Sequence, residues 1–431
     1  MADLIDEKKD QIFLCRYRAE NLIFSYQGKK IEMDPSNILT IEKLDDYEYN
    51  IRTILKLHLR MDIRWKLWIM KHKREITVKF ELVKLGQTRD VEEMIVGPEK
   101  CWNIDFSLRL NDDDESTDVA SMFGSMEMNE GDDFTEEELK KEDYFNSQNL
   151  VDIYLFDDKL LKASNKKYNE VITSGTIQNI IARILTKTGH KKVLMSKIEN
   201  SKSYQELLIP YHEAYKCIAY LDQYFGLYKK GSIVYYDVDK LYIINPNGKV
   251  TAREEEEWVD TVFLVTTRNE SIPGNAMVRK PGEKINYCNI TEEDINFNVP
   301  SITKNEKLGA SARIVVADGT SAGLEESSAE YVNSKNEMIR YVRSDDNKFM
   351  GTILKARMEE NNCIVMISAE NLDINAFTLN KTYKLVFDDE SKQKKYGKMK
   401  FRLSYAYHMI RHETEGYMIC GHRIVLKKVG D

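Results

Sequence analysis

Four residues near the C-terminal end are the strongest candidates for metal binding: His408, His412, Cys420 and His422. Imidazole nitrogen and thiolate sulfur are the ligand atoms that zinc commonly takes in proteins. The i, i+4 spacing of His408 and His412 places two side chains on one face only in a helix. The residues around them have the pattern of strand and turn instead. We therefore expect these side chains to lie on strand faces and in turns, and we predict no bound metal.

Carboxylates and cysteines elsewhere offer weaker candidates. Asp237 and Asp239 flank a turn that lacks the further oxygen ligands of a calcium loop, so their spacing is typical of a hairpin. Cys217 lies within an expected helix beside Ile218, which favours packing over nucleophilic catalysis. The 6 cysteines are far apart in the chain. This spacing excludes CxxC metal motifs and favours free thiols made in a reducing compartment.

Motifs of the common enzyme classes are missing from the sequence. It has no HExxH, no GxSxG, no P-loop and no glycine-rich dinucleotide motif after a strand. We therefore predict no catalytic, cofactor-binding or metal-binding residues, and no cofactor. No apolar run is long enough to span a membrane, and the acidic first residues lack the apolar core of a secretion signal. The 24 tyrosines are typical of a protein that buries surface in a complex.

Residues 111–148 carry most of the excess negative charge. They hold 14 Asp and Glu against two Lys, a local balance of −12, whereas the whole chain has a net charge of −8. Such a composition predicts a flexible insertion and speaks against nucleic acid as its partner. It can be a solvated spacer or a docking strip for a basic partner surface. Met122, Phe123 and Met126 would add adaptable apolar contacts to a docking strip.

An α+β unit is predicted over residues 149–250. A helix is expected over 176–188, because its apolar residues follow the i, i+3, i+4, i+7 pattern of an amphipathic helix. A second helix is expected over 211–225, with Phe225 on its buried face and Gly226 ending it. A hairpin over 232–244 follows directly.

β-rich blocks flank this unit. Residues 1–110 alternate apolar and polar side chains with period two, which predicts a small antiparallel barrel or sandwich. Residues 251–335 are expected to be a connection rich in strands and loops. Residues 336–431 form the second β-rich block, in which the segment 388–397 is expected to be a hairpin loop. The predicted fold is therefore α+β and mostly β, with two small tube-like antiparallel barrels, the α+β insert and long loops.

Residues 176–245 resemble the baseplate hub proteins of contractile phage tails, which are related to the hub part of type VI secretion spikes. The likeness lies in the helix end Leu-Asp-x-x-Phe-Gly-x-Tyr at 221–228, and in the hairpin Tyr-Tyr-Asp-Val-Asp-Lys-Leu-Tyr at 235–242. Outside this stretch the likeness is architectural only. The acidic insertion at 111–148 departs from the family's pattern and leaves the first domain boundary open.

The resemblance implies a structural virion protein of the tail baseplate, assembled in the host bacterial cytoplasm. Hub proteins form a homotrimeric ring of two similar barrels per chain. The ring joins the hexameric tail tube to the trimeric central spike, with baseplate wedge proteins as further neighbours. No catalysis, nucleic acid contact or membrane insertion is implied. The alternatives are a baseplate wedge or tail-tube initiator protein, and a cell-wall-degrading tail-associated hydrolase. A receptor-binding adhesin is disfavoured, because fibre-like repeats are absent.

Overall fold

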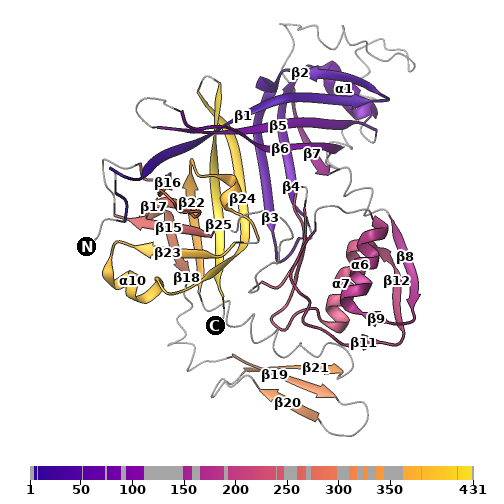
Figure 1. Ribbon diagram of the computed structural model, residues 1–431. Helices are drawn as coiled ribbons and strands as arrows, with labels where there is room; N and C mark the ends of the chain where they lie inside the picture. The colour runs from indigo at the N-terminus through magenta and orange to yellow at the C-terminus, as the bar shows by residue number, and fades with distance from the viewer. Residues whose placement is uncertain are drawn as a thin grey trace.

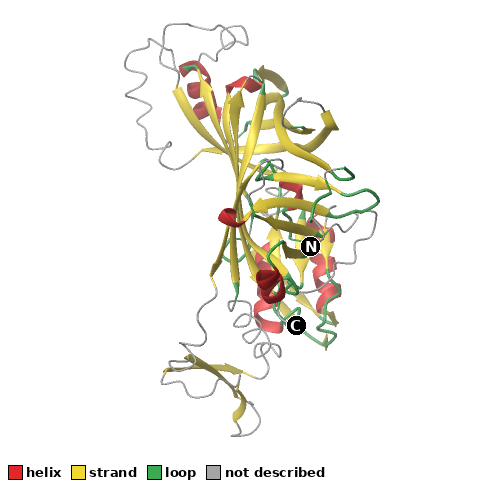
Figure 2. Cartoon of the chain, turned by 90° about the vertical axis from the view of Figure 1, so that its left-hand side faces the viewer, coloured by secondary structure: helices red, strands yellow, loops and turns green. Residues whose placement is uncertain are grey.

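The computed structural model gives a mostly β protein with a few short helices (Figures 1 and 2). It describes residues 4–6, 8–50, 52–72, 75–88, 94–110, 149–157, 166–188, 193–238, 240–246, 260–267, 273–298, 310–317, 324–328, 336–343, 363–379, 381–414 and 416–429. The acidic segment 111–148 lies outside these residues. Within them, no helix is both long and apolar enough to cross a membrane.

One 15-stranded sheet forms the body of the molecule. Its strands are β1 (Gln11–Tyr26), β2 (Lys29–Met33), β3 (Ile38–Asp46), β4 (Ile54–Met61), β5 (Thr77–Gln87), β6 (Met94–Leu110), β7 (Asn149–Asp157), β15 (Thr261–Thr266), β16 (Ala276–Arg279), β17 (Asn286–Thr291), β18 (Ile295–Asn298), β22 (Ile364–Glu370), β23 (Tyr383–Phe387), β24 (Phe401–Thr414) and β25 (Tyr417–Lys428). The order is β16-β17-β15-β23-β24-β3-β4-β7-β6-β5-β1-β25-β22-β18, with β2 beside β1. Neighbours are antiparallel, except that β15 runs parallel to both β17 and β23.

Strands β1 and β3–β7 form one block of this sheet, and strands from the C-terminal part of the chain pair with both of its edges. β24 pairs with β3, where Ile410 lies opposite Ile41, and β1 pairs with β5, β16 and β25. The indigo and yellow strands of Figure 1 therefore lie side by side. Their apolar faces share one core, which includes Tyr17, Phe80 and Leu426. The predicted mostly β fold is confirmed, whereas its division into two barrels and the domain boundaries remain predictions.

A smaller unit packs its own core around two helices. Its elements are α6 (Ile177–Thr188), α7 (Ala214–Phe225), β8 (Lys167–Ile172), β9 (Gly175–Thr176), β10 (Val193–Met195), β11 (Ser203–Tyr204), β12 (Leu207–Glu213), β13 (Ile233–Tyr236) and β14 (Leu241–Ile244). A separate three-stranded sheet holds β19 (Ala310–Ala317), β20 (Leu324–Ser328) and β21 (Asn336–Arg343). The helix α1 (Ile63–His72) follows β4, and α10 (Glu390–Tyr396) precedes β24.

Helix α6 confirms the helix predicted from its apolar spacing. All five apolar residues of the pattern are buried: Ile177, Ile180, Ile181, Ile184 and Leu185. The hydroxyl of Thr176 accepts a hydrogen bond from the backbone N–H of Asn179 at 3.3 Å, which satisfies a free donor at the start of the helix.

Helix α7 begins later than predicted. Residues 211–213 belong to β12, which pairs with β8 through Glu213 opposite Lys167. The predicted end is confirmed, because Gly226 adopts a φ of 68°, a backbone conformation that glycine reaches without a side-chain clash. The hairpin of β13 and β14 is also confirmed, with Tyr235 opposite Tyr242.

The strands on either side of 388–397 pair antiparallel as predicted, with Tyr383 of β23 opposite Phe401 of β24. The expected loop between them is wrong, because residues 390–396 form α10. Asp389 caps this helix by accepting a hydrogen bond from the backbone N–H of Lys392 at 2.8 Å. An acidic cap before a run of lysines near the helix end suits the helix dipole.

Candidate functional site

The hairpin of β24 and β25 brings together three of the four candidate metal ligands. His408 on β24 lies directly opposite His422 on β25. Cys420 is two residues before His422 on the same strand, so its side chain points to the same face of the sheet. All three residues are buried. The fourth candidate, His412, is elsewhere, because its Nε2 lies 2.8 Å from the carbonyl oxygen of Ile38.

The polar atoms of this His-Cys cluster (His408, Cys420 and His422) converge. The two Nδ1 atoms of the histidines are 2.8 Å apart, and Cys420 Sγ lies 3.8 Å from His422 Nδ1. One ligand atom from each of the three side chains lies within 4.8 Å of the others. The cluster therefore has the residue types and spacing to hold one small ion.

Hydrogen bonding fixes the proton positions in the His-Cys cluster. His422 Nε2 lies 3.1 Å from the Leu372 carbonyl oxygen, which can only accept, so Nε2 carries a proton. Burial lowers the pKa of His422 to about 4, so at neutral pH its Nδ1 has a free lone pair. His408 Nδ1 must then donate to it. Burial and the neighbouring His422 lower the pKa of His408 well below its ordinary value.

Aromatic and polar groups surround the cluster. The ring of Phe377 stacks on His408 at 5.7 Å and packs against His422 at 5.1 Å between ring centroids. The hydroxyl of Tyr17 donates to the Leu372 carbonyl at 2.9 Å and accepts from the backbone N–H of Ile374 at 2.9 Å. The cluster is therefore held between β1, the hairpin and the segment before β23.

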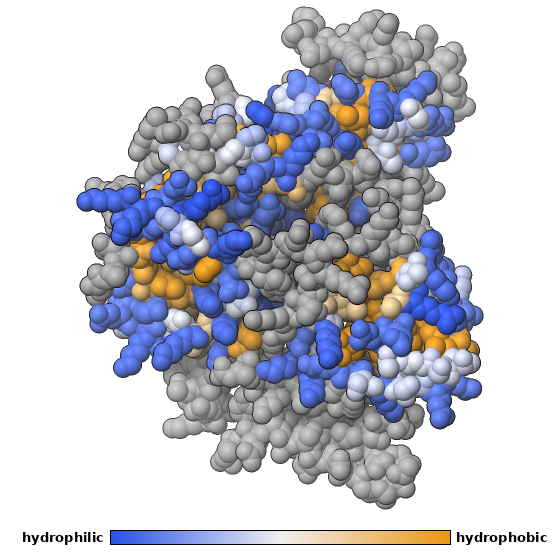
Figure 3. Space-filling view, viewed as in Figure 1, coloured by the Kyte–Doolittle hydropathy of each residue, from blue (hydrophilic) through white to orange (hydrophobic). Residues whose placement is uncertain are grey.

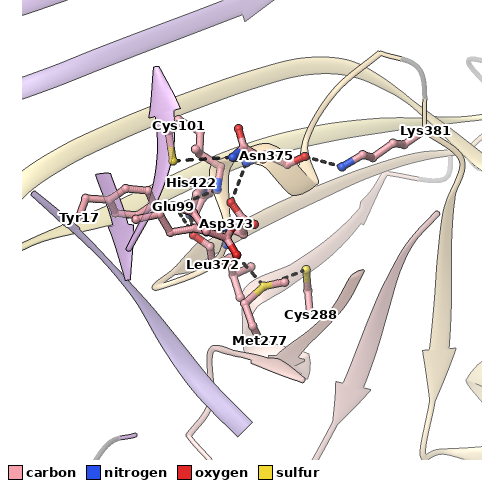
Figure 4. A network of polar contacts seen from close by, with 12 residues as sticks. Tyr17, Glu99, Cys101, Met277, Cys288, Leu372, Asp373, Asn375, Lys381 and His422 are labelled. Carbon is pink, nitrogen blue, oxygen red and sulfur yellow. Dashed lines mark hydrogen bonds and ion pairs between the residues drawn. The ribbon is translucent and has the colours of Figure 1, made fainter. Parts of the chain in front are cut away.

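A second polar group lies next to it, centred on Asp373 (Figure 4). Lys84 forms ion pairs of 2.8 Å with both Asp373 and Glu99. Burial would lower the pKa of Lys84, but the carboxylates of Asp373 and Glu99 together outweigh this effect and raise it. Lys381 donates to the Asn375 carbonyl, and burial lowers the pKa of Lys381 to about 8. These contacts connect β5 and β6 with the segment before β23.

A buried ionic network joins the smaller unit to the large sheet. Lys43 on β3 forms ion pairs with Asp45 and, at 3.0 Å, with Asp237 after β13. Burial would lower the pKa of Lys43, but the carboxylates of Asp237 and Asp45 raise it above its ordinary value. Asp45 also accepts hydrogen bonds from Thr53 at 2.6 Å and from Tyr235 at 2.9 Å. The network therefore positions the hairpin of β13 and β14 against β3.

The contacts of Asp237 and Cys217, two other candidates from the sequence, stabilise the fold. Asp237 belongs to this network, with its backbone N–H donating to the Lys240 carbonyl at 2.8 Å across the turn. Asp239 lies outside the described residues. Cys217 is buried in the core of the smaller unit, and burial raises the pKa of its thiol to about 11, which disfavours the reactive thiolate. The sequence contained no signal for the long-range network of Lys43 and Asp237.

The fold defines a mostly β protein with one large interleaved sheet and a helical unit docked on it by buried charges. The chain belongs to the family of the bacteriophage PBS1 gene 109 protein, whose family model matches residues 121–429. A comparison with curated proteins found no match.

A comparison with solved structures found distant matches among bacterial tail and secretion proteins. A tail protein from Neisseria meningitidis MC58 is 8% identical, with a TM-score of 0.49 over 95% of this chain and 96% of that one. A lidded PdpA-VgrG complex from Francisella is 8% identical, with a TM-score of 0.46 over 96% of this chain and 53% of that one. The E. coli c3393 protein, a component of the type VI secretion system, is 8% identical, with a TM-score of 0.39 over 93% of this chain and 76% of that one. The family membership confirms the likeness to phage proteins predicted from the sequence, whereas the particular role of a hub remains a proposal.

Proposed function

We propose that this protein is a structural part of a phage tail, and that it acts as the baseplate hub. In this role it forms a homotrimeric ring between the hexameric tail tube and the trimeric central spike, beside the baseplate wedge proteins. It works in the virion after assembly in the host cytoplasm, without catalysis of its own. The membership in a bacteriophage protein family supports the proposal. The observation that carries it is the pairing of strands in the large sheet.

The pairing supports two tube-like units in each chain. One ring of pairings can be followed from β24 through β3, β4, β7, β6, β5, β1 and β25 back to β24. A second runs from β24 through β23, β15, β17, β16, β1 and β25 back to β24. Three strands, β1, β24 and β25, are common to both rings. Two such units per chain, repeated in a trimer, would present a pseudo-sixfold surface to a hexameric tube.

Exposed apolar side chains support a role in assembly. Val171 and Leu208 lie opposite each other on the outer face of β8 and β12 and are each 57% exposed. Tyr211 on the same strand pair is 63% exposed. Figure 3 shows apolar side chains over this unit. A protein that works in an assembly gains by burying such side chains against a partner.

The native mass of the purified chain tests the proposal. A trimer has three times the chain mass of 50.3 kDa, about 151 kDa, and is expected to appear as a ring in electron micrographs. A hexamer or a single copy would favour the wedge or tube-initiator alternative. Clearing of bacterial cell walls in a zymogram, abolished by one carboxylate substitution, would overturn the proposal in favour of a hydrolase.

A further inference from the structure

We propose that His408, Cys420 and His422 bind one thiophilic metal ion with a filled d shell, Zn²⁺ or Cu⁺, between β24 and β25. This reverses the expectation drawn from the sequence that these residues bind no metal. The i, i+4 spacing of His408 and His412 would place two ligands together only on a helix. The antiparallel register instead places His408 opposite His422, 14 residues along the chain.

The separations between the ligand atoms fit such an ion. Zinc–nitrogen bonds of about 2.0–2.1 Å and zinc–sulfur bonds of about 2.3 Å at tetrahedral angles place two nitrogens about 3.3 Å apart, and nitrogen and sulfur about 3.6 Å apart. The observed separations are 2.8 Å for the two Nδ1 atoms and 3.8 Å for Sγ and His422 Nδ1. The third pair, Cys420 Sγ and the ligand nitrogen of His408, lies within 4.8 Å. Binding therefore needs the two ring nitrogens to separate by about 0.5 Å and the Cys420 thiol to approach His408 by at most about 1.2 Å.

The surroundings orient His422 as a ligand. Its Nε2 proton is donated to the Leu372 carbonyl, which leaves Nδ1 to face His408 and Cys420. A ring N–H donated to a backbone carbonyl is the usual support of a metal-bound histidine. Tyr17 donates to the same carbonyl and so holds that acceptor in place.

Without an ion, burying these three polar side chains in the core costs free energy of desolvation. Two imidazoles and a thiol are desolvated for one hydrogen bond between the rings, one to Leu372, and long, weak contacts of the Cys420 thiol with the Gly421 carbonyl at 3.7 Å and with His422 Nδ1 at 3.8 Å. His408 Nε2 has no hydrogen-bond partner within the described part of the chain, and it gains none when Nδ1 binds the ion. An ion adds three bonds to atoms that already converge.

Binding can be written with its protons balanced. The Cys420 thiol loses its proton to solvent, and the resulting thiolate bonds to the ion. The proton on His408 Nδ1 moves to Nε2, which frees Nδ1 as the third ligand. With Zn²⁺ the site has one net positive charge, near the Asp373 carboxylate whose field acts on His422. With Cu⁺ the site is neutral. Cysteine and histidine ligands suit both ions, and three ligands leave Zn²⁺ one position to fill.

The test is the metal content of the untagged full-length chain. Because the cluster is buried, the ion is supplied during expression, in separate cultures supplemented with zinc, copper or cobalt. We expect one ion per chain by elemental analysis from zinc or from copper, and the culture that gives it identifies the ion. Cobalt is a spectroscopic substitute for zinc, and its bond to a thiolate gives a charge-transfer absorption in the near ultraviolet.

Cys420→Ser should lose the charge-transfer absorption and at least about tenfold in metal affinity, a loss that changes to ligand shells commonly cause. Cys217→Ser is the matched control, since Cys217 is equally buried but belongs to the core of the smaller unit, and it should keep both. Wild-type chain with well under one ion in every culture would overturn the proposal, even if Cys420→Ser fails to fold. Equal loss of metal in both variants would also overturn it.

Discussion

Glu48 is the residue that most directly ties the turn after β3 to the last strands of the chain. Its carboxylate accepts from Arg402 at 3.1 Å, from Ser404 at 2.8 Å and from Lys427 at 2.7 Å. Burial alone would raise the pKa of Glu48, but these partners, led by Lys427, hold it below its ordinary value. The ionised form is therefore stabilised by folding.

Replacing Glu48 with Gln should destabilise the protein at neutral pH by about 0.5–1.5 kcal/mol, because two cations lose a charged acceptor at a site where water screens part of the attraction. A lowered carboxyl pKa contributes stability that is complete above the unfolded-state pKa and is lost as pH falls through the folded-state pKa. The gap between wild type and Glu48→Gln should therefore close below about pH 4.3, the ordinary glutamate pKa. Urea denaturation from pH 7 to pH 3 measures it.

Glu293→Gln is the matched control, because Glu293 is exposed and changes nothing buried. It should stay within about 0.5 kcal/mol of wild type at every pH. A gap for Glu48→Gln that is independent of pH would mean that the carboxylate charge contributes nothing and that only side-chain packing was lost.

The hydroxyl of Tyr235 offers a second test at this scale, in the network that docks the hairpin. It donates to the buried carboxylate of Asp45 at 2.9 Å, while its ring packs edge-on against Tyr47. Tyr235→Phe keeps the ring and removes only the hydrogen bond. It should cost about 1.5–3 kcal/mol, the range for hydrogen bonds to charged groups, measured by chemical denaturation. Tyr224→Phe changes a side chain that is 42% exposed and should cost little. Equal costs for the two variants would contradict the assigned role of the network.

The His-Cys cluster illustrates what sequence can predict of a site. Residue type alone identifies all its members as candidates, but the spacing in the sequence connects His408 with His412 and not with His422. The pairing of His408 with His422 depends on the register of β24 and β25, and that register depends on which face is buried. The surrounding Phe377 and Leu372 come from a distant segment that no local pattern connects with the hairpin.

At the scale of elements, the periodicity that predicts a helix also predicts which of its side chains are buried. This prediction of burial is less accurate at the ends of the helix. Ile218 in the middle of α7 is fully buried, whereas Phe225 at the last turn is half-buried. Ile218→Ala should therefore destabilise by about 2–5 kcal/mol, the range for deleting a large buried aliphatic side chain. From the helical pattern alone, Phe225→Ala would be expected to destabilise by about 3–5 kcal/mol, as for a fully buried Phe. Because Phe225 is only half-buried, this substitution should cost less than Ile218→Ala.

Lys216→Ala on the exposed face of α7 is the control for both variants, and chemical denaturation ranks the three. A loss for Phe225→Ala as large as that for Ile218→Ala would mean that the last turn is buried in solution, for example against another copy of the chain.

Two segments differ from the secondary structure predicted for them, and the first differs because of its tertiary contacts. The sequence at 211–213 is compatible with a helix, but pairing with β8 holds this segment in an extended conformation. Tertiary pairing overrides a weak local preference in this way. At α10 the reverse applies, since Asp389 is a local helix-capping signal that the predicted hairpin loop does not take into account.

At the scale of the whole molecule, alternating strands predicted a mostly β chain but gave no information on their order. The two β-rich ends were expected to fold as separate blocks, yet β1 pairs with β25 and β3 pairs with β24. Such pairings join residues more than 300 positions apart, and period-two patterns carry no information on partners. Only the arrangement of all strands together makes the two rings proposed for the hub.

The acidic segment 111–148 can be tested against this arrangement, because it connects two strands that already pair. β6 ends at Leu110, β7 begins at Asn149, and the two are antiparallel neighbours, with Leu110 opposite Ile153. A short glycine-serine loop can therefore replace the segment without moving either strand. We expect the shortened chain to keep the thermal stability of the wild type.

Binding to the neighbouring tail proteins is expected to respond differently if the segment docks on a basic surface. A balance of −12 over 38 residues attracts such a surface through Coulomb forces that salt screens beyond about 8 Å at physiological ionic strength. The deletion should then weaken binding at low salt, and the difference from wild type should shrink at high salt, because the intact chain loses the same attraction. A second variant keeps the length but replaces the 14 acidic residues with their amides, and it should behave like the deletion. If both variants bind as tightly as wild type at either salt concentration, the segment is a solvated spacer, and the hub proposal, which depends on other residues, is unaffected.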